Sequence, residues 1–219
     1  MKIEPSPKRV RTYLGGRLVA DTKNPVLVWE RPHYPTYYLP AADVRAELRP
    51  TSTADLYDVV VDGTTAPAAA VRRPESPELR DLVRIEWSAM DEWLEEDEPV
   101  YVHPRDPYKR VDVLASSRHV VVRIDGVVVA DSRAPRILFE TSLPPRYYLP
   151  LTDVRMDLLL PSATQTRCPY KGTATYWDVA IDDTVHSDVV WCYRSPLAES
   201  QKVAGLACFY DERVDLAVD

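Results

Sequence analysis

The sequence predicts a mainly β protein built from two small tandem domains with few short helices. The first observation is an internal repeat. Shifting the sequence by 110 positions places residues 10–48 on residues 120–158 without a gap, and 16 of the 39 paired positions are identical. The second is the presence of 20 prolines among 219 residues, because proline breaks the hydrogen bonding of a helix interior. A duplicated β unit without long helices is therefore expected.

A hairpin is expected near the start of each copy. In the second copy, β-branched residues at 119–124 and 127–130 flank an Asp-Gly pair at 125–126, which favours a tight two-residue turn. In the first copy, two glycines at 15–16 occupy the corresponding place. Both copies therefore begin with the same hairpin design.

Short strands follow each hairpin. Residues 26–30 and 136–140 are apolar runs that each follow a proline, and residues 174–181 alternate well enough for a strand that ends at an Asp-Asp turn. These segments predict further β-structure in both copies.

Helical structure is expected only in short pieces. Asp43 and Asp153 are predicted to cap a short helical turn at corresponding places in the two copies. Residues 88–96 form the best helix candidate, because their apolar side chains share one face at helical spacing.

The repeat sets the expected domain limits. The first copy is assigned to residues 1–93, a connector to 94–118, and the second copy to 119–219. The connector contains an acidic cluster, which is expected to be a solvated helix end. Past the gapless region the offset between the copies rises to 120, so the second copy has about ten extra residues, which include 166–173.

Composition excludes several classes of protein. The formal net charge of −7 argues against a general nucleic-acid binder. No apolar run approaches the length of a membrane span, and the first residues lack a signal-peptide core, so a cytoplasmic protein with no membrane partner is predicted. Three cysteines with no CxxC pair imply neither a disulfide framework nor a zinc finger.

The segment Cys168-Pro169-Tyr170-Lys171-Gly172, which the first copy lacks, is the sharpest local feature. Proline fixes the backbone after the cysteine and glycine permits a positive φ, so a constrained turn is expected. A nearby ammonium group favours the thiolate, which makes Cys168 and Lys171 the candidate catalytic residues. Lys171 is also a candidate to bind an anion or to act as a nucleophilic amine. A buried, inert cysteine beside a hairpin turn is the structural alternative.

The second copy is also rich in aromatic and charged side chains, which gives further candidate ligand-binding residues. Arg155 could offer a planar fork of donors to an anion, or pair with Glu140 or with Asp157. The aromatic residues could form the walls of a pocket or simply fill the core. The full candidate set is Glu140, Tyr148, Arg155, Tyr170, Trp191 and Tyr193.

These motifs, in this order and spacing, resemble the domain-of-unknown-function family 427. The resemblance rests on residues 126–132, 139–140, 147–150, 166–172, 191–193 and 209–210, and the first copy resembles a degenerate member. The resemblance implies two compact domains of the β-tent kind, a fold that often binds zinc elsewhere. Because this sequence lacks the paired CxxC knuckles of such zinc sites, no metal and no cofactor are predicted. The family also carries a nucleotidyltransferase label.

Three functions remain open. The leading hypothesis is a small-molecule pocket in the second copy around Cys168 and Lys171, taking an anionic or polar ligand, with catalysis if one of the two is reactive. The alternative is a non-catalytic protein-interaction module, in which the duplication builds a paired surface. The third is the nucleotidyltransferase that the label suggests.

Overall fold

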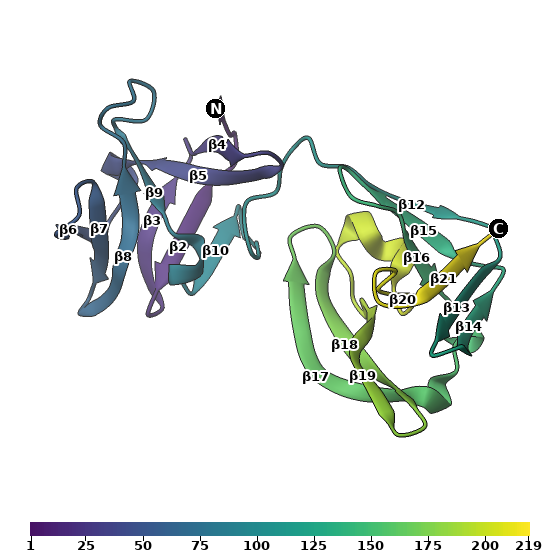
Figure 1. Cartoon of the computed structure of the whole chain (residues 1–219). Coiled ribbons are helices and arrows are strands. Elements are labelled where there is room, and N and C mark those ends of the chain that lie inside the picture. Colours follow the sequence, from purple (N-terminus) through teal and green to yellow (C-terminus); the bar gives the residue numbers. More distant parts are fainter. The chain divides into compact units, whose positions relative to one another are not determined.

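A computed structural model describes residues 1–219 and separates them into two compact units, 1–106 and 107–219 (Figure 1). Each unit is mainly β and contains only short 3-10 turns. The segment 94–118, assigned from the sequence to a connector, is divided between the units and contributes strands to both. Each unit is described below by itself.

The first unit contains two antiparallel sheets. A seven-stranded sheet has the order β1-β4-β5-β9-β8-β7-β6, and a four-stranded sheet has the order β11-β10-β2-β3. The strands are β1 (Lys2–Pro5), β2 (Val10–Leu14), β3 (Arg17–Thr22), β4 (Val26–Arg31), β5 (Tyr34–Pro40), β6 (Glu47–Pro50), β7 (Leu56–Val61), β8 (Thr64–Arg72), β9 (Leu82–Ile85), β10 (Glu92–Glu95) and β11 (Glu98–Pro99), with 3-10 turns η1 (Ala41–Asp43) and η2 (Trp87–Ala89).

The second unit repeats this arrangement. Its seven-stranded sheet has the order β12-β15-β16-β20-β19-β18-β17, and its smaller sheet has the order β14-β13-β21. The strands are β12 (Val111–Ala115), β13 (Val120–Ile124), β14 (Val127–Ser132), β15 (Arg136–Glu140), β16 (Arg146–Leu149), β17 (Leu159–Cys168), β18 (Gly172–Ile181), β19 (Thr184–Cys192), β20 (Ala207–Phe209) and β21 (Asp215–Val218), with 3-10 turns η3 (Leu151–Asp153), η4 (Met156–Leu158) and η5 (Ala198–Val203).

The two units therefore share one topology. Each strand of the large sheet in one unit has a counterpart at the same place in the other. Even an isolated bridge recurs, between Ala20 and Val44 in the first unit and between Ala130 and Val154 in the second. The mainly β class and the duplication predicted from the sequence are confirmed.

The predicted hairpins are also present. Strands β13 and β14 meet at Asp125 and Gly126, whose φ angles are 50° and 79°. Positive φ at both central residues matches the right-handed twist of the flanking strands. In the first unit Gly15 and Gly16 take the same conformation between β2 and β3.

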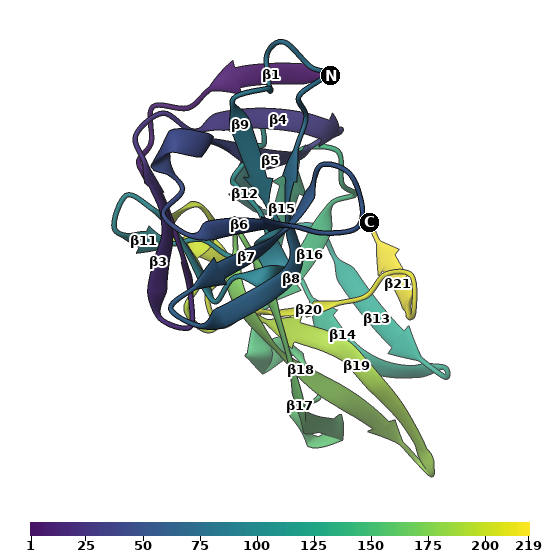
Figure 2. The ribbon, with the colours of Figure 1, turned by 90° about the vertical axis from the view of Figure 1, so that its left-hand side faces the viewer.

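The extra residues of the second copy lengthen one hairpin. Strands β17 and β18 each span ten residues, whereas the corresponding β6 and β7 span four and six. Figure 2 shows the β6–β7–β8 meander of the first unit and the longer β17–β18–β19 meander of the second. Cys168 pairs with Gly172 at the end of the long hairpin, where Gly172 has a φ of 95°. The constrained turn predicted there is confirmed.

Apolar side chains fill the space between the large and the small sheet of each unit. Val19, Leu39 and Val83 are fully buried in the first unit, and Val129, Leu149 and Ala207 in the second. The second unit has another buried cluster, rich in aromatic residues, which includes Tyr148, Trp191 and Cys208.

The predicted helix over residues 88–96 is wrong. Trp87–Ala89 forms a single 3-10 turn, and Glu92–Glu95 is strand β10, in which Trp93 pairs with Thr12 of β2. The acidic cluster is not fully solvated either. The Glu95 side chain is buried, and it accepts hydrogen bonds from the Tyr37 hydroxyl at 2.9 Å and from Lys8.

The short helical turns predicted at Asp43 and Asp153 are present, but neither aspartate caps them. Each is the last residue of its turn, and a proline occupies the N-cap position. The carboxylates instead accept hydrogen bonds from the hydroxyls of Thr22 and Ser132, each at 2.6 Å. The aspartates therefore connect the turn to the small sheet in both units.

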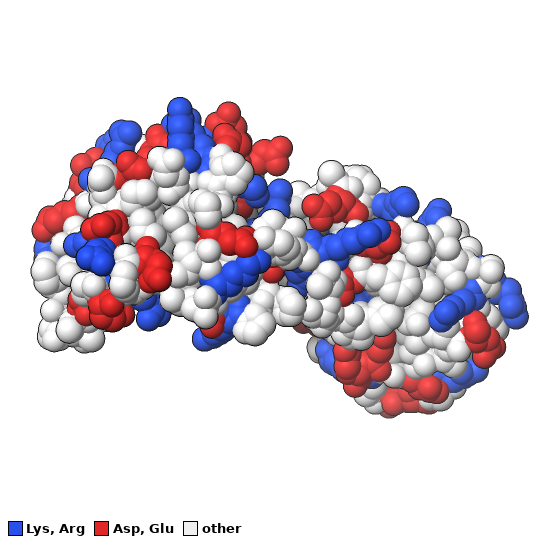
Figure 3. All heavy atoms as spheres, turned by 90° about the horizontal axis from the view of Figure 1, so that it is seen from above, with Lys and Arg blue, Asp and Glu red and all other residues white.

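The surface carries both signs of charge. Figure 3 shows basic and acidic side chains interspersed on the face in view, with neither sign covering a whole unit. No helix in the structure combines the length and apolar character that crossing a membrane would need.

Candidate functional site

A buried carboxylate organises the candidate residues of the second copy. Glu140 ends strand β15, and its side chain is only 4% exposed. Lys171, from the turn between β17 and β18, donates to one carboxylate oxygen, and Lys109 lies 2.9 Å from the other. Both lysine side chains are also largely buried, at 13% and 6% exposed. One carboxylate thus holds two ammonium groups that come from distant parts of the chain.

The charge of Glu140 depends on these neighbours. Burial opposes ionisation, but the ammonium groups of Lys171 and Lys109 outweigh it and hold the pKa of the Glu140 carboxyl below its ordinary value. The group is therefore a stable ion cluster at neutral pH.

Tyr170 is associated with both lysines: it precedes Lys171 in the chain, and its ring contacts Lys109. Its ring is buried, and Lys109 lies over it at 5.3 Å from the ring centre. Its carbonyl accepts a hydrogen bond from the hydroxyl of the buried Ser200 in η5. These contacts fix the turn that presents Lys171.

Three of the predicted aromatic residues belong to the aromatic cluster of this unit. The Trp191 indole donates to the Tyr148 hydroxyl at 3.2 Å, and their rings meet edge to face at 6.3 Å. Tyr193 and Cys208 belong to the same buried cluster. Burial raises the pKa of the Tyr148 and Tyr193 hydroxyls, so both remain neutral donors at physiological pH.

Cys168 is the partly exposed cysteine of the three. It closes the β17–β18 hairpin opposite Gly172 and lies near the ring of Tyr193. Cys192 and Cys208 are buried, and burial raises the pKa of both thiols.

Iodoacetamide is therefore expected to alkylate the native protein at Cys168 alone. The reagent reacts with thiolates, and both accessibility and ionisation are reduced at the two buried cysteines. Peptide mass spectrometry reads the modified position, and Cys168→Ala serves as the control that should stay unmodified until it is denatured. Native labelling of Cys192 or Cys208 would contradict this assignment.

The structure does not bring Arg155 into this group. Arg155 precedes η4, is more than half exposed, and forms a bidentate pair with Asp157 at 2.6 and 2.8 Å. Of the two partners considered from the sequence, it takes Asp157 and not Glu140. The other seven candidate residues lie in or beside the Glu140 cluster and the aromatic cluster.

The first copy has an equivalent, partly buried acid with different partners. Glu30 accepts hydrogen bonds from Arg73 at 2.6 Å, from Arg84 at 3.2 Å and from the Tyr38 hydroxyl at 2.9 Å. Burial disfavours its charge, but the Tyr38 hydroxyl and the two guanidinium groups hold the pKa of the Glu30 carboxyl below its ordinary value.

Strand register shows why the partners differ. Arg84 pairs with Tyr38 across the sheet, and the residue that pairs with Tyr148 in the second copy is Cys208. The second copy therefore has a thiol where the first has a guanidinium. At Glu140 the positive charges come instead from Lys109 and Lys171, which lie outside the strands that the two copies share.

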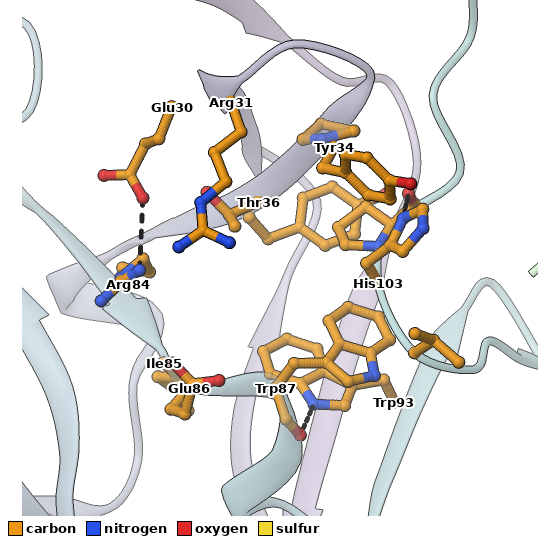
Figure 4. A pocket seen from close by; sticks show the side chains of 14 residues that line it. Glu30, Arg31, Tyr34, Thr36, Arg84, Ile85, Glu86, Trp87, Trp93 and His103 are labelled. Atoms are coloured by element: carbon orange, nitrogen blue, oxygen red, sulfur yellow. Dashed lines mark hydrogen bonds and ion pairs between the residues drawn. The ribbon is translucent and has the colours of Figure 1, made fainter. Parts of the chain in front are cut away.

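A pocket of about 380 Å³ lies beside Glu30 in the first unit (Figure 4). The β4–β5 hairpin, β9, η2, β10 and residues 102–104 surround it. Trp87 and Trp93 stack at one side of it, with ring centres 4.5 Å apart and planes within 8°. Arg31, Arg84 and His103 also line it.

The sequence reasoning missed this pocket because it looked for chemistry that the second copy has and the first lacks. The pocket is indicated instead by residues that the first copy has and the second copy lacks. Trp87 and Arg31 have no aromatic or basic counterpart in the second copy, where the corresponding positions are Asp211 and Thr141. No group of three or more His, Cys, Asp or Glu side chains is arranged to hold a metal ion.

One protein family matches the chain twice. The family NTP_transf_9, described as a domain of unknown function (DUF427), matches residues 2–96 and again residues 112–219. No curated protein matches the chain. The two matched ranges coincide with the two repeats of the topology.

Proposed function

The chain belongs to the DUF427 family as two tandem copies, and we propose that the C-terminal copy binds an anionic small molecule beside Glu140 and Lys171. The supporting observation is that two largely buried ammonium groups share one carboxylate at the turn that only this copy has. We also propose that the protein is located in the cytoplasm.

The arrangement allows Lys171 to bind a ligand without leaving Glu140 unpaired. Lys171 and Lys109 contact different oxygens of the carboxylate. If an anion draws the Lys171 ammonium away, Lys109 still balances the buried charge, which avoids the cost of an isolated ion. A lysine held in this way is a pre-positioned but releasable anion binder.

The aromatic residues and Cys168 fit the same role. Tyr193 lies near Cys168 and Glu140 and shares a buried cluster with Trp191, and the neutral Tyr193 hydroxyl can donate to a ligand. If a reaction follows binding, Cys168 and Lys171 are the side chains with nucleophilic atoms at this place. The pocket next to the equivalent acid of the first copy supports ligand binding as the use of this part of the fold.

A protein-interaction module is the second candidate. Leu114 on β12 and Phe139 on β15 are both more than 40% exposed. Because Phe139 pairs with Asp112, Leu114 and Phe139 share one face of the sheet. Such an exposed apolar pair is typical of a contact surface, although it is small.

A thermal-shift screen separates the two functions. Phosphate, citrate, AMP and MgATP are tested on the wild type, on Lys171→Ala, and on Lys202→Ala as a control lysine in the same copy. A ligand at about 100 times its Kd stabilises the native state by about 2.7 kcal/mol, which raises the Tm by several degrees. We expect at least one anion to shift the wild type and Lys202→Ala but not Lys171→Ala.

The change in Tm on adding ligand is measured relative to the Tm of the same variant without ligand, so any effect of the substitution on stability cancels. Equal shifts in all three proteins place the anion elsewhere, and no shift with any anion leaves the interaction module as the better candidate.

A further inference from the structure

We infer that the pocket of the first copy is a second, independent ligand site, which takes a flat ring bearing one anionic group. The inference rests on the pocket beside Glu30 and not on the Lys171 turn. Its volume of about 380 Å³ is in the size range of small-molecule sites, which is about 300–1,000 Å³.

The stacked indoles provide a surface for a ring. Trp93 is 3% exposed, and its indole N–H donates to the Trp87 carbonyl at 3.1 Å, so the pair is held in place from the protein side. Trp87 is only half-buried and lines the pocket. A rigid, flat aromatic surface of this kind favours a planar ligand, which loses little freedom when it stacks.

Two arginines provide for the anionic group. The guanidinium of Arg31 points into the space beside the indoles (Figure 4). No hydrogen bond or ion pair holds it within the chain. The Nε of Arg84 is buried and has no acceptor, although its Nη1 contacts Glu30. Both groups are donors whose capacity is not used up by the protein.

The remaining lining limits the charge of the ligand. Glu30 is already matched by Arg73 and Arg84, but Glu86 has no basic partner and accepts only from the Ser88 hydroxyl. A second negative group on the ligand would meet this carboxylate. A single anionic group is therefore the better fit.

His103 and Tyr34 form the wall above the indoles. Their rings meet edge to face at 5.2 Å, and the Nδ1 of His103 donates to the Pro104 carbonyl at 2.7 Å. Because that bond fixes which nitrogen carries the proton, the imidazole is oriented before any ligand arrives. The aromatic wall and the indole floor together suit a ring more than an aliphatic acid.

Isothermal titration calorimetry with four probes tests the inference. The probes are quinoline-2-carboxylate and its neutral parent quinoline, and AMP and its neutral parent adenosine. We expect at least one anionic probe to bind the wild type at least about tenfold more tightly than its neutral parent, as one charge-assisted hydrogen bond implies. Comparing the carboxylate with the phosphate shows which anion the pocket prefers.

Two substitutions and their matched controls complete the test. Arg31→Ala is expected to remove the advantage of the anion, and Trp87→Ala to weaken both members of a pair. Arg49→Ala, an exposed arginine paired with Glu47, and Lys202→Ala, the control lysine of the second copy, are expected to bind as the wild type does. The inference is overturned if no probe binds, if charged and neutral probes bind equally, or if Arg31→Ala binds like the wild type.

Discussion

Replacing Glu140 by glutamine is expected to destabilise the second unit by about 3–5 kcal/mol, the usual cost of removing one partner from a buried ion pair. The amide cannot balance the two largely buried ammonium groups that contact the carboxylate. The first unit should unfold as before, because no contact of Glu140 lies within it.

Urea titration with pulsed hydrogen-exchange mass spectrometry measures this effect, because it reads peptides from each unit separately. Glu212→Gln is the matched control. Glu212 is an exposed acid paired with Arg146 in the same unit, and such surface pairs contribute at most about 1 kcal/mol. Equal effects of the two substitutions would show that Glu140 is not a buried ion in solution.

The difference between wild type and Glu140→Gln should also depend on pH. Because the pKa of Glu140 is lowered in the folded state, its contribution is complete above the unfolded value of about 4.3 and is lost as the pH falls through the folded pKa. The stability gap is therefore constant near neutral pH and narrows in acid. A gap that stays constant down to pH 2 would contradict the assigned ionisation.

Replacing Trp93 by alanine is expected to destabilise the first unit by about 3–5 kcal/mol, as for other large aromatic residues deleted from a core. Trp93 packs in the core of that unit, stacks on Trp87 and donates to its carbonyl. The second unit should keep its stability.

The same urea titration checks this expectation, with Trp87→Ala as the control. Trp87 is only half-buried, so its loss should cost about 1–2 kcal/mol. If both substitutions cost the same, Trp93 does not have the deeper position that the structure gives it.

The sequence predicted those parts of the fold that depend on neighbouring residues. The turn at Asp125 and Gly126 requires two positive φ angles, and this local requirement is visible in the residue types. The turn ending at Gly172 is predictable for the same reason. The shared topology follows from the repeat itself, since similar sequences fold alike.

The error over residues 88–96 has a specific cause. Met90, Trp93 and Leu94 are spaced as on a helix, but nine residues are too few to separate the two periodicities. In the strand, Trp93 and Glu95 are the buried pair, and a buried glutamate reads as a polar position. Pairing of Trp93 with Thr12, which lies far away in the sequence, decided the outcome.

The sequence indicated most of the residues of the candidate site, but it did not indicate which of them form ion pairs with one another. Lys171 and Lys109 each lie about thirty residues from Glu140 in the sequence, and nothing local links them to that acid. Arg155, which lies closer to Glu140 in the sequence, found a still nearer partner in Asp157. Long-range ion pairs of this kind depend on the completed fold.

The strand order has a consequence for synthesis on the ribosome. Every strand of the first seven-stranded sheet, β1 and β4–β9, emerges before β10, which pairs with β2 near the start of the chain. Such long-range pairing must wait for its last member. Because Trp93 lies on β10, a nascent chain from which only residues before 92 have emerged would contain every strand of the large sheet but lack one of the two stacked indoles of the pocket. Ligand capture by the first copy can therefore begin only after its β-sheet framework has formed.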